Sequence, residues 1–347
     1  MPAAMSHATA RDEPDSVAFM NLTRFAVPSI RRSVFQLVTT SGGYIAGWMT
    51  MLWLTDINYW LVLALSIPVA GLLVRLFIIF HDCGHGSFFR SRRANAITGR
   101  TLGVLTLTPY DAWRRRHAAH HAGTGNLDGD RSLGTFQTWT VEEFHSRRWY
   151  QRLFYRCYRH PLVLFGFGAV FYFAIAQRFP QNVPGSHQKA ERRSVLGTDL
   201  AIGAVVLAMS LLVGWRRFLL VQTPLIIITS VVGMWLFFVQ HQFHDAYWER
   251  QASWRFHSAA LYGSSFYDLP RFLHWFTGNI GFHHIHHINS RIPNYRLPEC
   301  MEESGRLLAL APRLTLTGSF RCARLALWDE SRRLLVSFKD ATLRASA

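Results

Sequence analysis

Histidine is the residue type that could carry chemistry in this 347-residue chain, because most of its 17 histidines fall into four short clusters. The first cluster places His81 and His85 four residues apart, at the end of a long apolar stretch. Residues at i and i+4 of a helix lie on one face, so both imidazoles could bind a single metal ion. The alternative is a pair of polar residues at the boundary of the apolar stretch.

Two further clusters share the spacing HxxHH. Their histidines are His117, His120 and His121 in one cluster, and His283, His286 and His287 in the other. Positions i, i+3 and i+4 of a helix lie on one face, which directs three ring nitrogens the same way. His284 falls outside that face. The arginines at 114–116 also allow a solvated charged face at the earlier cluster, but the repeated spacing favours metal ligands.

The fourth cluster follows another apolar stretch and contains His241 and His244. These are positions i and i+3 of a helix, so either or both could face the same site. Metal-bound imidazoles usually donate their second ring N–H to a carboxylate or a carbonyl. Five polar residues near the clusters could accept this N–H: Asp82, Asp111, Asp128, Asp245 and Asn279. Each of them could instead be a helix cap or a surface group.

The number of histidines indicates more than one metal ion. Structural zinc uses four ligands, and catalytic zinc uses three and a water molecule. Two first-row metals with four or five nitrogens each would use about nine histidines. Imidazole suits iron, copper and zinc alike, so the ligand type alone does not choose the metal.

The composition indicates a membrane protein. Half of the residues are hydrophobic and 17% are charged, yet the net charge is +16. Soluble domains carry roughly 25% charged residues. The basic residues flank long apolar runs, as in membrane proteins, whereas a nucleic-acid binder would gather them on a polar face. We therefore expect a lipid bilayer and no nucleic acid as partner. The four cysteines form no CxxC pair, which argues against a thiolate zinc site.

Apolar stretches of about 20 residues can cross a bilayer. Four such spans are predicted, at about 33–54, 59–80, 198–214 and 219–240. A further stretch, 161–178, is short and glycine-containing with basic residues on both sides, and its crossing would separate the histidine clusters. We predict it to be re-entrant or interfacial, with 96–110 as a second interfacial segment. Four crossings then place both termini and all four clusters on the cytoplasmic face.

The predicted fold class is an all-α integral membrane protein, with four transmembrane helices and a cytoplasmic helical cap that carries the histidine site. Residues 1–32 are expected to form an N-terminal cytoplasmic tail and 33–305 the membrane domain. Residues 306–347 are expected to form a cytoplasmic amphipathic segment. A metal site at the mouth of such a bundle faces acyl chains, which offer no polar bond to hydrolyse. That setting fits oxygen activation at two irons, with attack on C–H bonds.

The sequence around the histidines resembles the membrane fatty acid desaturase superfamily, whose three histidine boxes read HxxxH, HxxHH and HxxHH. Five segments are similar to bacterial and plastid-type acyl-lipid desaturases of the Δ12 (omega-6) group. They are HDCGHGSFF, WRRRHAAHHAGTGNLD, VQHQF followed by DAYWE, SSFYDLP and WFTGNIGFHHIHHINSRIPNYRL. The resemblance covers roughly residues 35–305. It implies nine iron ligands: His81, His85, His117, His120, His121, His283, His286, His287 and His241. Position 244 is usually glutamate in that group, so His244 could be a substitute beside the metals or an alternative ligand.

The resemblance also implies the reaction, an O₂-dependent introduction of a cis double bond into a fatty acyl lipid. Two irons and two electrons from outside the chain would be needed. The sequence lacks the HPGG of a fused cytochrome b5 domain, so the donor is expected to be a separate ferredoxin-type, or cytochrome b5-type, protein. A bacterial inner membrane is the expected location. Arginines that could dock the donor or bind lipid phosphate are Arg90, Arg92, Arg93, Arg100, Arg114, Arg115 and Arg116. Candidates to line an acyl tunnel, or to form an interfacial aromatic belt, are Trp113, Trp139, Trp275 and Phe276.

Two other functions compete with this interpretation. A di-iron hydroxylase or ketolase of a carotenoid, sterol or alkane would use the same scaffold. A membrane metal-binding protein or transporter would need polar residues at mid-span depth, forming a path. The spans contain few such residues, and Arg75 is the main exception.

Overall fold

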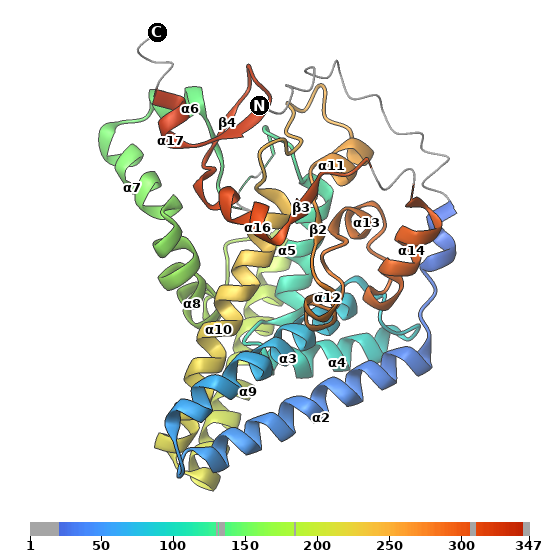
Figure 1. The fold of residues 1–347 in the computed structure, drawn as a ribbon, viewed down its shortest axis with the longest axis vertical. Coiled ribbons are helices and arrows are strands. Elements are labelled where there is room, and N and C mark those ends of the chain that lie inside the picture. The colour runs from blue at the N-terminus through green and yellow to red at the C-terminus, as the bar shows by residue number, and fades with distance from the viewer. Residues whose placement is uncertain (1–20, 130, 132–135, 184, 306–309, 343–347) are drawn as a thin grey trace.

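The computed structural model describes residues 21–129, 131, 136–183, 185–305 and 310–342. Long helices form one half of the molecule, and short helices and strands form a cap over one end of them (Figure 1). This arrangement agrees with the predicted helical membrane protein. The two halves meet where the long helices α3 and α10 end.

The first helical hairpin consists of α2 (Ile30–Leu54) and α3 (Tyr59–His85). Asn58 caps α3, because its side chain accepts the Trp60 N–H at 2.8 Å. The helix ends at His85 because Gly86 adopts a left-handed conformation with φ of 70°, which is easy only for glycine. The HxxxH motif therefore occupies the last turns of this helix.

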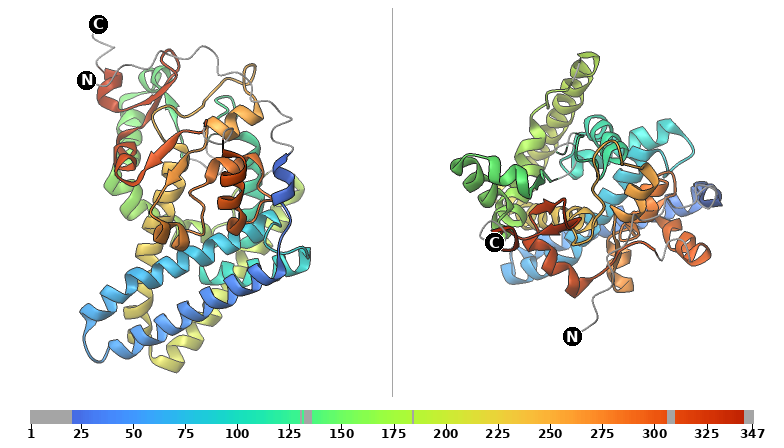
Figure 2. Two further views of the ribbon diagram at one scale, coloured as in Figure 1. Left: turned by 45° about the vertical axis from the view of Figure 1, so that its right-hand side comes forward. Right: turned by 90° about the horizontal axis from the view of Figure 1, so that it is seen from above.

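The second hairpin consists of α9 (Gln188–Val213) and α10 (Trp215–His241), joined at Gly214. Helices α3, α9 and α10 are each long and apolar enough to cross a membrane. The outward face of α9 fits a lipid environment, since Leu211 and Leu212 are 78% and 77% exposed. Figure 2 shows both hairpins on the same side of the cap.

The described residues contain three helices that could span a membrane, or four spans if one bent helix pair counts as a span. Helix α2 has 25 residues, but the polar run at 39–43 lowers its apolar character and it is not among these three. Helix α7 (Trp149–Arg159) and the helical run over 162–178 form a pair bent by 62°, which is either a broken span or a re-entrant loop. The span at 33–54 and the re-entrant segment at 161–178 therefore stay predictions.

The helical run over 162–178 contains several short helical types. It comprises the π-helical η2 (Leu162–Phe167), α8 (Gly168–Val170), the π-helical η3 (Phe171–Ile175) and the 3₁₀ turn η4 (Ala176–Arg178). A 3₁₀ turn, η5 (Gly185–His187), then leads directly into α9.

Helices α4 (Arg92–Leu105) and α5 (Tyr110–Gly123) pack beside the end of α3. The interfacial segment predicted at 96–110 corresponds to most of α4 and the turn before α5. The Tyr110 hydroxyl donates to the Cys83 carbonyl at 2.7 Å and fixes the start of α5 against α3. This contact places the first HxxHH motif beside the HxxxH motif.

The cap contains short strands as well as helices. Its helical elements are α6 (Val141–Ser146), α11 (Phe256–Tyr262), α12 (Arg271–Phe276), α13 (His283–Ile288), η6 (Asn294–Arg296), α14 (Leu297–Glu303), α16 (Leu316–Ser319), η7 (Phe320–Arg324) and α17 (Phe338–Thr342). Strand β1 (Trp139–Thr140) pairs in parallel with β4 (Leu327–Asp329), which pairs antiparallel with β5 (Leu334–Val336). Strand β2 (Phe266–Asp268) pairs in parallel with β3 (Arg313–Thr315).

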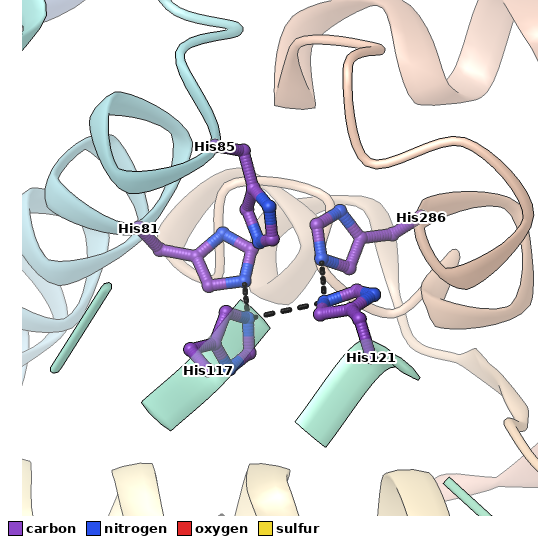
Figure 3. A group of neighbouring side chains, drawn as sticks. All are labelled: His81, His85, His117, His121 and His286. Atoms are coloured by element: carbon purple, nitrogen blue, oxygen red, sulfur yellow. Dashed lines mark hydrogen bonds between the residues drawn. The ribbon is translucent and has the colours of Figure 1, made fainter. Parts of the chain in front are cut away.

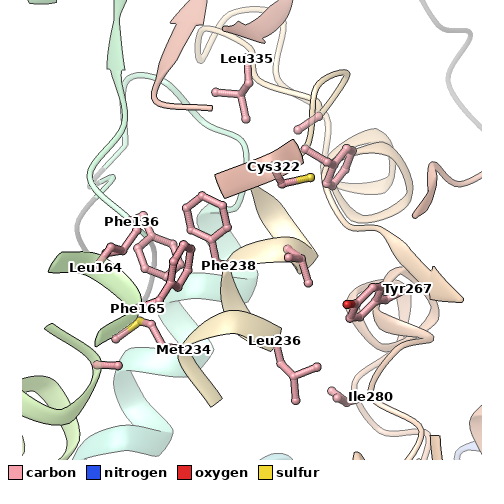
Figure 4. Close-up of a cluster of buried hydrophobic side chains, with 14 of the residues drawn as sticks. Phe136, Leu164, Phe165, Met234, Leu236, Phe238, Tyr267, Ile280, Cys322 and Leu335 are labelled. Carbon is pink, nitrogen blue, oxygen red and sulfur yellow. The ribbon is translucent and has the colours of Figure 1, made fainter. Parts of the chain in front are cut away.

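The helices of the cap agree with the predicted fold class, but the C-terminal end of the cap also contains strands β3, β4 and β5, which the sequence did not predict. Strands of three residues are too short to show an alternating pattern. They form because buried side chains anchor them to α10. Phe238 of α10 contributes to one apolar cluster with Phe165, Cys322 and Leu335 (Figure 4).

The described part of the predicted N-terminal tail is also folded. The 3₁₀ turn η1 (Asn21–Phe25) buries Leu22 and Phe25 in a cluster with Leu261 and Ile285 of the cap. Residues 1–20 lie outside the described part of the chain.

Candidate metal centre

Nine histidines from α3, α5, α10 and α13 converge in two groups, each with its ligand nitrogens within 4.8 Å of one another. One group of five consists of His81, His85, His117, His121 and His286. One group of four consists of His120, His241, His283 and His287. The four clusters of the sequence therefore meet at one end of the helices, as predicted.

The group of five surrounds a small space between α3, α5 and α13 (Figure 3). His117 Nε2 lies 3.0 Å from His81 Nε2 and 3.2 Å from His121 Nε2. His286 Nε2 lies 3.1 Å from His121 Nε2. The rings of His85 and His286 approach edge to face, with centroids 4.7 Å apart.

The group of four is centred on His241, the last residue of α10. His241 Nε2 lies 3.1 Å from His120 Nε2 and 3.0 Å from His283 Nε2. The Nδ1 of His241 is 3.0 Å from the Gly263 carbonyl. Because that carbonyl can only accept, Nδ1 carries the proton and Nε2 presents its lone pair to the group.

Each HxxHH motif divides between the two groups. On α5, His117 and His121 belong to the group of five and His120 to the group of four. On α13 the division is reversed, since His283 and His287 join the group of four and His286 joins the other. Consecutive residues of a helix point about 100° apart, so neighbouring histidines belong to different groups while the i, i+4 pair shares one group.

The histidines of α5 and α13 are held in the neutral form that binds metals. Burial, and then repulsion between neighbouring imidazoles, lowers the pKa of these residues well below the usual value. The pKa values lowered in this way are those of His117, His120, His121, His283, His286 and His287. Metal ions bind unprotonated imidazole, so the site is prepared for cations at neutral pH.

The residues present fit a pair of metal ions better than a network of hydrogen bonds. Two neutral imidazoles facing each other through Nε2 share at most one proton, and His85 Nε2 and His287 Nε2 have no hydrogen-bond partner. Ligand nitrogens at right angles on a metal about 2.1 Å away lie about 3.0 Å apart. The observed separations of 3.0 to 3.2 Å match that spacing. The groups could therefore hold one ion each.

Asp82 is the one predicted supporting carboxylate that lies at the centre. Its Oδ1 is 3.4 Å from His81 Nδ1. Its Oδ2 accepts the backbone N–H of Asn294 at 2.7 Å and the side-chain amide of Asn294 at 2.8 Å. Asn294 in turn accepts the Gln36 amide at 2.9 Å. Asn294 and Gln36 were not predictable from sequence, because an isolated amide residue gives no sign of its contacts before the chain folds.

The other predicted supporting residues have different roles. The Asn279 side chain donates to the Asn294 carbonyl at 3.1 Å, so it braces the loop that holds Asp82. Asp245 is exposed and belongs to neither group. Asp111 and Asp128 accept hydrogen bonds from Arg100 and Arg250 respectively, away from the histidines.

His244 is exposed and lies outside both groups. Helix α10 ends at His241, and Gln242 already leaves helical geometry with φ of −116° and ψ of 73°. His244 and His241 therefore do not share a helix face, which was the basis for considering both. The His244 carbonyl also accepts the Leu335 N–H at 2.8 Å, which ties this loop to β5.

A buried ion-pair network fixes α5 against α9. Glu191 is fully buried and accepts a hydrogen bond from Arg115 at 2.8 Å, with Arg116 at 3.9 Å. Arg116 also donates to Gln177 at 2.7 Å. A buried carboxylate needs such partners, so the network orients the helix that carries three of the nine histidines.

This network corrects part of the predicted basic surface, because Arg115 and Arg116 point inward. Arg100 pairs with Asp111 at 2.9 Å. The predicted arginines that remain exposed are Arg90, Arg92, Arg93, Arg100 and Arg114.

Among the aromatic residues proposed for an acyl tunnel, only Trp113 touches the histidines. Its ring stacks on His117 with centroids 4.3 Å apart. Trp139 stacks on Tyr155 in the cap, and Phe276 packs on Gly71. Trp275 contacts Arg75 instead.

The fold and the site together define a membrane protein with a histidine-rich centre suited to two metal ions. Residues 57–313 match the family described as fatty acid desaturase. A protein of Bacillus subtilis named fatty acid desaturase is 43% identical over 315 residues, which cover 91% of this chain and 88% of that protein. This chain belongs to the fatty acid desaturase family, and it is an oxidoreductase.

Two Synechocystis proteins show more distant similarity. The one named sn-1 acyl-lipid omega-3 desaturase (ferredoxin) is 31% identical over 242 residues, covering 65% of this chain and 62% of that protein. The one named sn-1 oleoyl-lipid 12-desaturase is 26% identical over 269 residues, covering 75% of this chain and 72% of that protein. The superfamily predicted from the histidine boxes is thus confirmed, while these names include more than one double-bond position.

Proposed function

We propose that this enzyme introduces a cis double bond at the Δ12 (omega-6) position of a fatty acyl chain in a membrane lipid, using O₂ and two irons. The observation that carries the proposed oxidation is the pair of all-histidine groups, buried at the end of apolar helices. The Δ12 position is supported by the similarity to the protein named sn-1 oleoyl-lipid 12-desaturase. When bound, two irons would supply the oxidising power that a C–H bond of a methylene requires.

The group of five would hold one iron and the group of four the other. Neither group provides six ligands, so each ion would keep a position that no protein atom fills, as catalytic metal sites do. Around this position the chain provides apolar walls. Trp113 covers His117, and the Phe237 ring lies 5.4 Å from the His120 ring and 5.8 Å from the His241 ring. Such apolar walls would exclude water from the centre.

The overall reaction requires an electron donor. Removing two hydrogens from adjacent methylenes and reducing O₂ to two waters takes two further electrons and two protons from outside the substrate. We propose a ferredoxin-type donor, with a cytochrome b5-type donor as the alternative. A similar protein carries ferredoxin in its name, and ferredoxins are acidic, so the exposed arginines of 90–100 would attract one.

We also propose that the centre faces the cytoplasm at a bacterial inner membrane. An excess of arginine accompanies the segments that lead to the histidines, which is the pattern of cytoplasmic loops. The link between α2 and α3 contains Asp56 and no basic residue, as suits the opposite side.

Product analysis tests the reaction and its position. Expression in a host whose lipids are rich in oleate is expected to yield a diene with the new double bond at Δ12. Gas chromatography with mass spectrometry of derivatised acyl chains measures it. The His120→Ala variant should insert into the membrane and yield no diene. An added oxygen would instead identify a hydroxylase, and a diene with the new bond elsewhere would refute the Δ12 assignment alone.

Metal analysis tests the centre itself. The purified protein is expected to contain about two irons per chain, because one histidine group provides five imidazoles for an ion and the other provides four. Plasma emission spectrometry, with iron supplied during growth, checks this value. A single zinc per chain, without iron, would be incompatible with the proposed chemistry.

A further inference from the structure

A pocket of about 510 Å³ opens between the start of α2, the middle of α3 and α12, apart from the histidine groups. Arg75 and Gln36 line it, together with Arg32, Glu299 and the apolar side chains of Phe35 and Trp275. Phe35 and Trp275 are 69% and 47% exposed. The pocket therefore combines polar groups with an apolar rim.

Arg75 carries a charge that no carboxylate neutralises among the described residues. It lies in α3, one of the helices apolar enough to cross the membrane. Its Nη1 donates to the Trp275 carbonyl, its Nε donates to Thr40 Oγ1 at 3.3 Å, and its guanidinium stacks on the Trp275 ring. These contacts hold the side chain in place and leave N–H donors for a ligand. A charged residue within a membrane helix is costly and usually serves a function.

Gln36 provides a second, independent sign of a ligand. Its side chain is 4% exposed, and its Oε1 has no hydrogen-bond partner. The amide cannot turn away freely, because its Nε2 donates to Asn294 Oδ1, and Asn294 is held in turn by Asp82. A buried acceptor without a donor costs stability, so a ligand that brings a hydroxyl or an ammonium group would satisfy it.

The other polar groups at the pocket are already paired. Arg32 pairs with Glu299, which cancels both charges. The net positive charge of the pocket therefore comes from Arg75. A guanidinium fork suits the two free oxygens of a phosphodiester. The exposed Phe35 and Trp275 suit the acyl chains attached to such a headgroup.

We propose that this pocket binds the phosphate-bearing headgroup of a membrane glycerophospholipid. Arg75 binds the phosphate, and Gln36 Oε1 accepts a hydrogen bond from a headgroup hydroxyl or ammonium. The proposal concerns lipid binding and is independent of which acyl chain the enzyme desaturates.

Native mass spectrometry of the full-length, delipidated protein tests this site. The probes are dioleoyl-phosphatidylglycerol, dioleoylglycerol with the same chains and no phosphate, and soluble sn-glycerol 3-phosphate. We expect dioleoyl-phosphatidylglycerol to bind at least about tenfold more tightly than either of the other probes. Dioleoylglycerol lacks the hydrogen-bonded ionic contact of the phosphate, and glycerol 3-phosphate lacks the apolar contacts of the acyl chains. Equal binding of dioleoylglycerol would overturn the headgroup assignment. Equal binding of glycerol 3-phosphate would overturn the lipid assignment.

Variants then test whether Arg75 provides the positive charge that binds the phosphate. Arg75→Gln should reduce the preference for phosphatidylglycerol by about tenfold, and Arg75→Lys, which keeps the charge but loses the planar fork, should give a preference between that of Arg75→Gln and that of the wild type. Arg31→Gln is the matched control, since Arg31 is exposed on the same end of α2 and does not line the pocket. An unchanged preference in Arg75→Gln would refute the proposal. If that variant fails to fold, the three probes on the wild-type protein still decide it.

Discussion

Replacing His241 by alanine is expected to lower product formation to less than about one hundredth of the wild-type rate. His241 Nε2 is the nitrogen that His120 and His283 both face, at 3.1 and 3.0 Å. Its loss leaves only three imidazoles in that group. Removing residues that merely orient a ligand costs 10–100-fold, so the loss of a ligand should cost more. Product formation in membranes with a fixed amount of enzyme measures the effect, and iron content should fall from about two ions to about one.

His244→Ala is the matched control, because both histidines lie at the end of α10 and only His241 reaches a group. The side chain of His244 is exposed, and the His244 carbonyl accepts the Leu335 N–H, a backbone contact that alanine keeps. We therefore expect activity and iron content close to wild type. A larger loss in His244→Ala than in His241→Ala would assign the ninth ligand to His244.

Eight of the nine histidines could be found from helical spacing, because spacing is a local property, whereas His241 was preferred to His244 only through the resemblance to the desaturases. His117 and His121, or His283 and His287, must share a face wherever their helix lies. The same geometry implies that His120 and His121 diverge, and it explains why each HxxHH motif serves both groups. The prediction that all three histidines of a motif face one place is therefore wrong, because the middle histidine of each motif belongs to the other group.

Contacts that depend on tertiary packing were not predictable from spacing. Asn294 reaches Asp82 across 212 residues, and Gln36 reaches Asn294 across 258. Likewise Arg115 and Arg116 belong to a run that suggests a solvated surface, yet the buried Glu191 of α9 draws them inward. The strands of the C-terminal segment form because α10 offers an apolar face to pack on, not because of their own pattern. In each case the local structure depends on a contacting residue that is distant in sequence.

Replacing Asp82 by asparagine is expected to reduce activity 10–100-fold, in keeping with other residues that orient metal-bound histidines. Oδ2 of Asp82 accepts two N–H groups from Asn294, while Oδ1 faces His81 Nδ1. An asparagine has only one acceptor oxygen. Whichever way its amide turns, an NH₂ group meets either the Asn294 donors or the N–H of His81. The His81 ring then loses its fixed orientation in the group of five.

Iron release and KM together should distinguish a loss of His81 positioning from a loss of folding. Asp82→Asn should release iron faster to a chelator, while KM for the lipid changes little, and the exposed Asp245→Asn should behave as wild type. Asn294→Ala is expected to weaken the centre through the same contact, so the double variant should lose no more activity than the more affected single variant. Additive losses would show that Asn294 does not act through Asp82. Iron retention unchanged in Asp82→Asn would show that the carboxylate does not position His81.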